Sequence, residues 1–178
     1  MRFAKYHGTL NDFLLVEESV TPEQAIRMCD RHGGIGADGV AVVSASPPSM
    51  RIYNPDGSVP EMCGNALRCV VKHLAPRLGG TGPWTFSTDA GPLQAWLEGA
   101  DVVVDMGPPR QPVQERVVEG LRGWTTSMGN PHFVLESDDP EGDAKRIGRS
   151  LSVHPTFPEG CNISFTRWVS DTHVKAFV

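Results

Sequence analysis

The pattern of apolar and polar positions in the first half of the chain predicts mostly short strands. Runs rich in Val, Ile, Leu, Phe and Tyr alternate with segments containing Gly, Pro, Asn or Asp, which is typical of strands joined by turns. The predicted strands are residues 2–6, 12–17, 39–44, 50–54, 84–88, 93–97 and 102–106.

Two helices are predicted among these strands. The first should begin after Thr21, because Thr21 and Gln24 fit a capping box and Pro22 suits the first helical position. It should run to about Asp30. The second should open at residue 63 or 64 and stop near Pro76. Its apolar residues recur at helical spacing, which indicates a largely buried helix with sheet around it: Leu67, Val70, Val71 and Leu74.

A break at Gly107-Pro108-Pro109 is the best candidate for a domain boundary. It predicts a first domain of residues 1–106 and a second of residues 107–178. Beyond the break, one short helix is expected around residues 142–149. The strands expected there are residues 115–118, 124–127, 132–136, 162–169 and 173–178.

Composition is that of a soluble globular protein. The 178 residues are 39% hydrophobic and 21% charged, with a formal net charge of −5. No basic run suggests a nucleic-acid-binding face, so that class of partner is disfavoured. No signal peptide is recognisable at the N-terminus. No apolar run approaches the roughly 18 residues of a membrane span. A cytoplasmic location is therefore expected, with no membrane partner.

Four cysteines are too few and too scattered for a disulfide framework. A zinc site is not expected either. No Cys-x2-Cys pair occurs, and Cys69 with His73 lacks a second pair of ligands. Cys29 and Cys69 are predicted to pack inside the fold. Cys161 has no evident role.

Cys63 stands where a tight turn leads into the second helix. Unpaired N–H groups and a partial positive charge are found at helix N-termini, where thiols ionise more readily and carboxylates can dock. A thiol beside the N–H groups of Gly64 and Asn65 points to proton abstraction from the α-carbon of an amino acid. The alternative is that Cys63 is a small buried apolar residue.

Several distinctive segments follow one another along the chain. They are His7-Gly8 with Asn11-Asp12-Phe13, residues 30–39, Met62-Cys63-Gly64-Asn65 with Arg68-Cys69, residues 127–132, His154-Pro155 with Phe157-Pro158, and Asn162. In this order they resemble the diaminopimelate epimerase family, and the resemblance extends from residue 3 to about residue 165, nearly the whole chain.

The resemblance implies an α/β (α+β) fold of two similar domains, each a curved mixed β-sheet wrapped around a central helix. It also implies epimerisation of LL- and meso-diaminopimelate without pyridoxal phosphate or any other cofactor. Cys63 would be one of two acid–base thiols, and His132 would assist a catalytic thiol. The residues implied in substrate binding are Asn11, Asn54, Gly64, Asn65, Asn130 and Asn162.

Within that set the roles differ. The backbone of Gly64 and Asn65 would hold the carboxylate at the reacting centre, and Asn11 would lie close to it. The other three asparagines would bind the distal amino-acid end of the substrate, although Asn11 and Asn54 are also ordinary turn residues.

The sequence also departs from the family. Thr9-Leu10, Pro55 and Ala66 replace residues that are usual there. The family's Glu-Arg-Gly segment and its second helix, headed by Ala-Cys-Gly, have no match. We therefore expect the second domain to be incomplete and to expose an apolar sheet face. We also expect the 178-residue chain alone to be inactive and to be part of a longer protein.

The partner expected is a small diamino-dicarboxylate substrate, and a homodimer is one option for assembly. Two other readings stay open. One is another isomerase of the same fold, similar to proline racemases or phenazine-biosynthesis proteins. The other is a non-catalytic half-protein that binds an amino acid or a partner domain.

Overall fold

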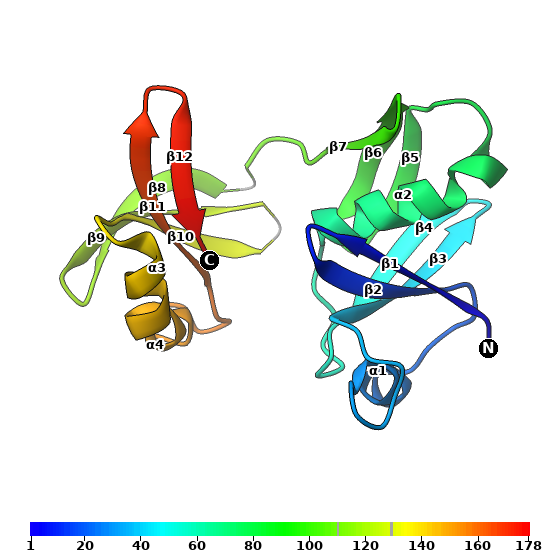
Figure 1. The fold of residues 1–178 in the computed structure, drawn as a ribbon, viewed down its shortest axis with the longest axis horizontal. Helices are drawn as coiled ribbons and strands as arrows, with labels where there is room; N and C mark the ends of the chain where they lie inside the picture. Colours follow the sequence, from blue (N-terminus) through cyan, green and yellow to red (C-terminus); the bar gives the residue numbers. More distant parts are fainter. Residues whose placement is uncertain (110, 129) are drawn as a thin grey trace. The chain divides into compact units, whose positions relative to one another are not determined.

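The computed structural model describes residues 1–109, 111–128 and 130–178. The chain divides into two compact units, Met1–Gly107 and Pro108–Val178. Figure 1 shows the course of the chain through both.

The first unit is built on a seven-stranded mixed sheet in which the strands lie side by side in chain order. Neighbouring strands are antiparallel except for the pairs β2–β3 and β4–β5, which are parallel. Every strand predicted for this half is present, with ends moved by up to two residues. The strands are β1 (Phe3–Gly8), β2 (Asn11–Val16), β3 (Gly39–Ala45), β4 (Pro48–Tyr53), β5 (Trp84–Thr88), β6 (Gly91–Glu98) and β7 (Asp101–Asp105).

Helix α1 (Pro22–Cys29) covers one face of this sheet and begins as predicted. The hydroxyl of Thr21 accepts a hydrogen bond from the Gln24 N–H at 3.3 Å. The Gln24 side chain accepts one from the Thr21 N–H at 2.9 Å. The face beneath α1 carries Leu14 and Val16 of β2, which alternate along the strand with residues of the opposite face.

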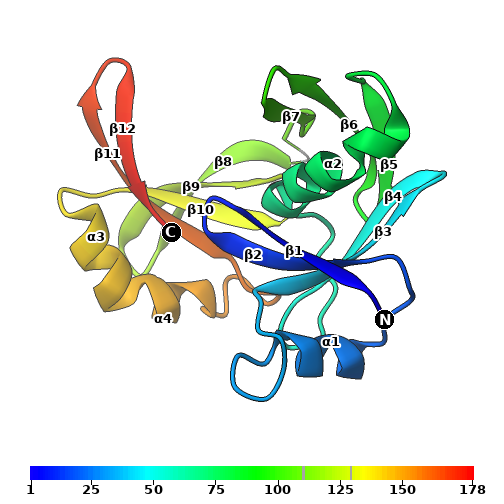
Figure 2. The same cartoon turned by 45° about the vertical axis from the view of Figure 1, so that its right-hand side comes forward.

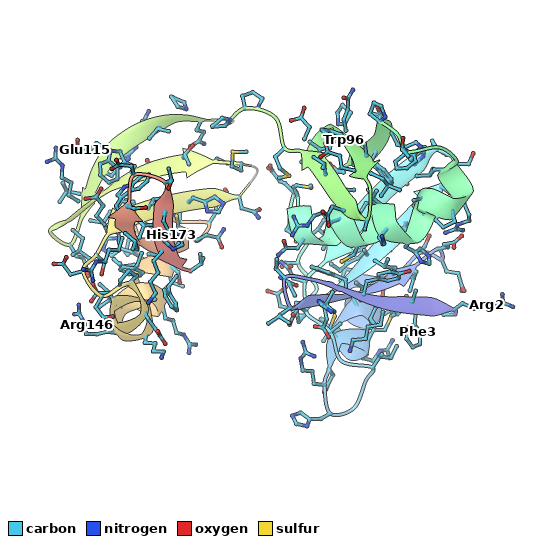
Figure 3. All side chains as sticks on the ribbon, turned by 45° about the horizontal axis from the view of Figure 1, so that its top comes forward. Arg2, Phe3, Trp96, Glu115, Arg146 and His173 are labelled. Atoms are coloured by element: carbon cyan, nitrogen blue, oxygen red, sulfur yellow. The ribbon has the colours of Figure 1, made fainter. Side chains whose placement is uncertain are left out.

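Helix α2 (Gly64–Leu78) lies across the opposite face, as Figure 1 shows. Its buried residues Leu67, Val70 and Leu74 pack on Leu15 of β2 and Phe86 of β5 in the main core. The first unit therefore is a mixed sheet curled around a central helix. At the outer edge of the sheet, Phe3 and Arg2 reach solvent (Figure 3).

The predicted end of this helix near Pro76 falls two residues short, because α2 continues to Leu78 with Pro76 in its last turn. A proline there removes a single intrahelical hydrogen bond. Leu78 packs against the core, and the Gly79 N–H closes the helix on the Ala75 carbonyl at 3.2 Å. No helix in the described part of the chain is long and apolar enough to cross a membrane.

The second unit contains a five-stranded sheet in the order β12-β11-β10-β9-β8, in which only β10 and β11 run parallel. The strands are β8 (Gln111–Val118), β9 (Leu121–Ser127), β10 (Pro131–Glu136), β11 (Asn162–Ser170) and β12 (His173–Phe177). Three consecutive helical segments join β10 to β11: α3 (Pro140–Asp143), η1 (Ala144–Gly148) and α4 (Arg149–Ser152).

These helical segments are longer than the helix predicted at residues 142–149. They begin two residues earlier, where Asp139 caps a proline-headed turn: its side chain accepts a hydrogen bond from the Gly142 N–H at 3.2 Å. The segments pack on Phe133 of β10 and Phe165 of β11. One face of the second sheet is thus a closed core.

The two units repeat one connectivity. In each, an antiparallel pair leads through a helical crossover into a parallel neighbour and then an antiparallel strand: β1-β2-α1-β3-β4 and β9-β10-α3/α4-β11-β12. Figure 2 shows both crossovers. The face of the second sheet opposite its helices bears the partly or largely exposed Trp124, Val174 and Trp168, the last 62% exposed. This is the apolar face that the sequence led us to expect.

Candidate functional site

Cys63 is the N-cap residue of α2, as predicted. It has an extended backbone (φ −143°, ψ 108°), and its carbonyl accepts the Leu67 N–H at 3.0 Å to open the helix. No side chain caps this helix, and its first turn contains no acidic residue. The N–H groups of Gly64 and Asn65 therefore meet no carboxylate of their own turn, next to a half-buried thiol.

The hairpin between β1 and β2 lies against this helix start. A Cβ on Gly8 would be 2.9 Å from the carbonyl oxygen of Asn65, so only glycine permits the approach. The two turn residues, Thr9 and Leu10, have φ values of 51° and 67°, a left-handed pair that suits a tight hairpin. The turn ends at Asn11, which pairs with Gly8 across the hairpin. Asn11 is thereby brought to the first turn of α2.

The Asn11 side chain holds an acceptor without a donor. Its Oδ1 is buried and has no hydrogen-bond partner among the described residues. Leaving such a group unpaired costs about 1–3 kcal/mol, so native proteins rarely do so without a reason. An ammonium or N–H group of a ligand would satisfy it.

A charged network around Asp12 also stabilises the β1–β2 hairpin. Arg31 forms a two-pronged contact with Asp12, at 3.2 and 2.7 Å, and reaches Asp38 at 2.7 Å. Lys5 adds a 3.0 Å ion pair to Asp12 and donates to the Gly36 carbonyl at 2.6 Å. The hydrogen bond from Arg31 holds the pKa of Asp12 well below its usual range. This network anchors the residue next to Asn11.

The sequence did not reveal that role. Residues 30–39 were recognised as a family segment, and no function was assigned to Arg31 or Asp38. The signal that could have found them is the pairing of β2 with β3, which sets Asp12 opposite Asp38. The Asp38 N–H donates to the Asp12 carbonyl at 2.9 Å.

Asn54 closes a tight turn before Cys63. Its N–H donates to the Ser58 carbonyl at 2.8 Å, its Nδ2 donates to the Ser58 hydroxyl at 2.9 Å, and its carbonyl accepts the Gly57 N–H at 2.9 Å. Gly57 takes a φ of 81° to complete the turn. The backbone of Asn54 thus forms a tight turn, which fits the alternative that Asn54 is a structural turn residue.

In the second unit, Asn130, His132 and Asn162 come together at one end of the parallel pair β10–β11. His132 and Asn162 are register partners, and the Asn162 Nδ2 donates to the Pro131 carbonyl at 3.2 Å. Asn130 directly precedes β10. Burial lowers the pKa of His132, which favours the neutral imidazole at pH 7. A pocket of about 290 Å³ opens here, with His132 among its lining residues.

That three asparagines bind one end of a ligand stays a prediction. Asn130 and Asn162 are neighbours in the second unit. Asn54 belongs to the first unit, on the turn that precedes Cys63.

The other described cysteines are poor candidates for chemistry. Cys29 and Cys69 are buried among apolar residues, and this burial raises the pKa of both thiols. Burial also raises the pKa of Cys161, to about 11. Among the described residues, Cys63 is the one thiol that combines partial exposure with a helix N-terminus.

Comparison with known proteins decides the family. Residues 3–112 match the family model described as diaminopimelate epimerase. The chain belongs to the diaminopimelate epimerase family. The chain is therefore an isomerase of the epimerase type.

Similar curated proteins cover nearly all of the chain. The diaminopimelate epimerase of Synechococcus elongatus is 41% identical, over 98% of this chain and 74% of the relative. That of Trichodesmium erythraeum is 39% identical, over 97% and 73%. That of Pelotomaculum thermopropionicum is 39% identical, over 98% and 74%.

Solved structures share the fold at low sequence identity. A hydroxyproline epimerase from Agrobacterium vitis, with bound trans-4-hydroxy-L-proline, aligns with a TM-score of 0.64 at 15% identity, over 98% of this chain and 68% of that one. A phenazine biosynthesis protein of Bacillus anthracis aligns with a TM-score of 0.61 at 14% identity, over 99% and 71%. These likenesses confirm the predicted mixed α+β fold of two curled sheets.

Proposed function

We propose that this epimerase interconverts LL- and meso-diaminopimelate by proton transfer at the α-carbon, with the Cys63 thiol as one of two acid–base groups. The observation that carries the proposal is the position of Cys63 as the uncapped N-cap of α2. A thiol there faces an anion-binding helix end, in a chain whose relatives are diaminopimelate epimerases.

The chemistry follows from that arrangement. An amino acid has a very weakly acidic α-proton, so its removal needs stabilisation of the charge that develops on the carboxylate. The N–H groups of Gly64 and Asn65 supply fixed dipoles for that charge. The buried Oδ1 of Asn11 would accept from the α-ammonium group. Inversion then needs a second acid–base group on the opposite face of the carbon.

Diaminopimelate has a second amino-acid end, and three asparagines would hold it. Asn130 and Asn162 supply amide groups beside His132 in the second unit. Asn54 would add a third from the first unit. His132, neutral at pH 7 because burial lowers its pKa, would assist a thiol by accepting or returning a proton. We further propose a cytoplasmic role in lysine and cell-wall precursor synthesis.

The test is substrate choice by the protein expressed from its own gene. LL-diaminopimelate, meso-diaminopimelate, L-proline and trans-4-hydroxy-L-proline are each incubated with it, and the stereoisomers are separated by chiral chromatography. The proposal expects interconversion of the two diaminopimelate isomers with both proline compounds unchanged. Turnover of a proline compound alone would favour the other isomerase reading. No turnover of any amino acid would favour a binding protein.

A further inference from the structure

Arg68 reaches back over the first turn of α2. Residues four apart lie above one another on a helix, and helical side chains lean toward the N-terminus. The Arg68 guanidinium lies close to Gly64: a Cβ there would stand 3.9 Å from the Arg68 Nη1, an ordinary van der Waals contact. A cation therefore sits beside the residue whose N–H group faces the proposed carboxylate.

The same guanidinium holds the neighbouring residue. The Arg68 Nη2 donates a hydrogen bond to the Asn65 Oδ1. On its other side, the carbonyl of Asn65 packs against Gly8 of the β1–β2 hairpin. Asn65 is thus fixed at both its backbone and its side chain.

Arg68 has no carboxylate partner in the part of the chain that the structure describes. The ion pairs there involve other basic groups, among them Arg77 with Glu17 at the far end of the same helix. Arg68 is also only partly exposed. Burial raises the pKa of the Cys69 thiol, and the positive charge of Arg68 opposes that rise. A half-buried cation without a counterion favours binding of an anion nearby.

We propose that Arg68 is a positioning residue of this site: it orients Asn65 and holds a positive charge beside the carboxylate bound at the helix start. The role rests on the proposed function. The sequence pattern had indicated no role for Arg68. Because charge on the carboxylate grows as the α-proton leaves, Arg68 stabilises the transition state more than the bound ground state. Its removal should therefore lower kcat and leave KM nearly unchanged.

The experiment compares Arg68→Gln, Arg68→Lys and Arg68→Ala with Arg77→Gln in the protein expressed from its own gene. Arg77→Gln removes the same charge from the same helix, more than two turns away. We expect Arg68→Gln to lower kcat for LL-diaminopimelate about 100-fold, in the range for loss of one stabilising group. Arg68→Lys should recover part of that loss. Arg77→Gln should stay within about twofold of the wild type.

Two further measurements separate positioning from folding. Guanidinium ion added to Arg68→Ala should restore part of kcat, which repair of a merely structural defect would not do. In an Asn65→Ala background, Arg68→Gln should cost much less than in the wild type, because coupled residues are not additive.

The outcomes are distinct. Wild-type turnover with an unaltered kcat in Arg68→Gln would overturn this role and leave the proposed function standing. Failure of both Arg68→Lys and guanidinium to recover any activity would also overturn it. Absence of diaminopimelate turnover in the wild type would overturn the proposed function and this role together.

Discussion

Gly8 lies so close to Asn65 that a Cβ on residue 8 would stand 2.9 Å from the Asn65 carbonyl oxygen. This contact ties the β1–β2 hairpin to the head of α2, and with it Asn11 to the helix start. Gly8→Ala should therefore push the hairpin away from the helix. We expect a loss of about 1–3 kcal/mol in the free energy of unfolding, typical of overpacking, and a larger proportional loss of activity. Urea unfolding and steady-state kinetics measure the two effects.

Gly33→Ala is the matched control for that variant. A Cβ there would meet only the Asp30 carboxylate, at 3.7 Å, which is an ordinary contact. Its unfolding free energy and activity should stay close to the wild type. Equal losses in the two variants would show that the close contact between Gly8 and Asn65 matters to neither stability nor activity.

Arg31→Met should weaken the network around Asp12. Asp12 is only 18% exposed and Arg31 is 54% exposed, so solvent screens part of the interaction. We expect a measurable loss in the free energy of unfolding at pH 7, because Arg31 donates hydrogen bonds to the Asp12 carboxylate.

The pH dependence of that loss has a definite sign. Arg31 holds the pKa of folded Asp12 below its unfolded value. The stabilisation is then complete above about pH 4 and is lost as the pH falls further. Urea unfolding of the wild type and Arg31→Met from pH 7 downward should show their difference in unfolding free energy narrowing only below about pH 4. A gap that stays constant into that acidic range would contradict the account.

Leu10 offers a stabilising substitution. It is 86% exposed and has a φ of 67°, so its side chain contributes little packing while its backbone is strained. Leu10→Gly should raise the unfolding free energy by about 0.5–1 kcal/mol, because glycine adopts this conformation without a steric penalty. Leu10→Ala keeps the strain and should bring no gain. A gain in both variants would point to removal of the apolar side chain instead.

The four thiols should alkylate at different rates, which peptide mass spectrometry after iodoacetamide treatment can follow. Cys63 should react first, because Cys29 and Cys69 are buried. Cys161 should be slow at pH 7 and should speed up about tenfold per pH unit until near its raised pKa of about 11. Faster labelling of Cys161 than of Cys63 at pH 7 would contradict the assignment.

The head of α2 was predictable because the information is local. An apolar helical repeat, a preceding turn and a cysteine at the junction define an N-cap within a few residues. The strands were predictable for the same reason, since alternation and turn residues mark them. The end of α2 was not, because packing of Leu78 outweighs the local effect of Pro76.

The contacts that support the site could not be predicted from the sequence, because they join residues far apart along the chain. Arg31 and Asp12 lie 19 positions apart, and Gly8 meets Asn65 only once the hairpin has folded onto the helix. Arg68 is nearer in sequence to its partner. Even so, a helical arginine usually faces solvent, and the hydrogen bond from Arg68 to the Asn65 side chain is visible only in the structure. The left-handed turn at Thr9-Leu10 was also hidden, since neither residue type favours it.

The central claim, that Cys63 transfers the α-proton, is tested most directly by solvent exchange. The protein expressed from its own gene is incubated with diaminopimelate in deuterium oxide, and loss of the α-proton signal is followed by NMR. We predict rapid exchange in the wild type and in Cys29→Ala and Cys161→Ala, and strongly slowed exchange in Cys63→Ala, most of all for the isomer whose α-proton faces the Cys63 thiol. Exchange at the wild-type rate in Cys63→Ala would contradict the account.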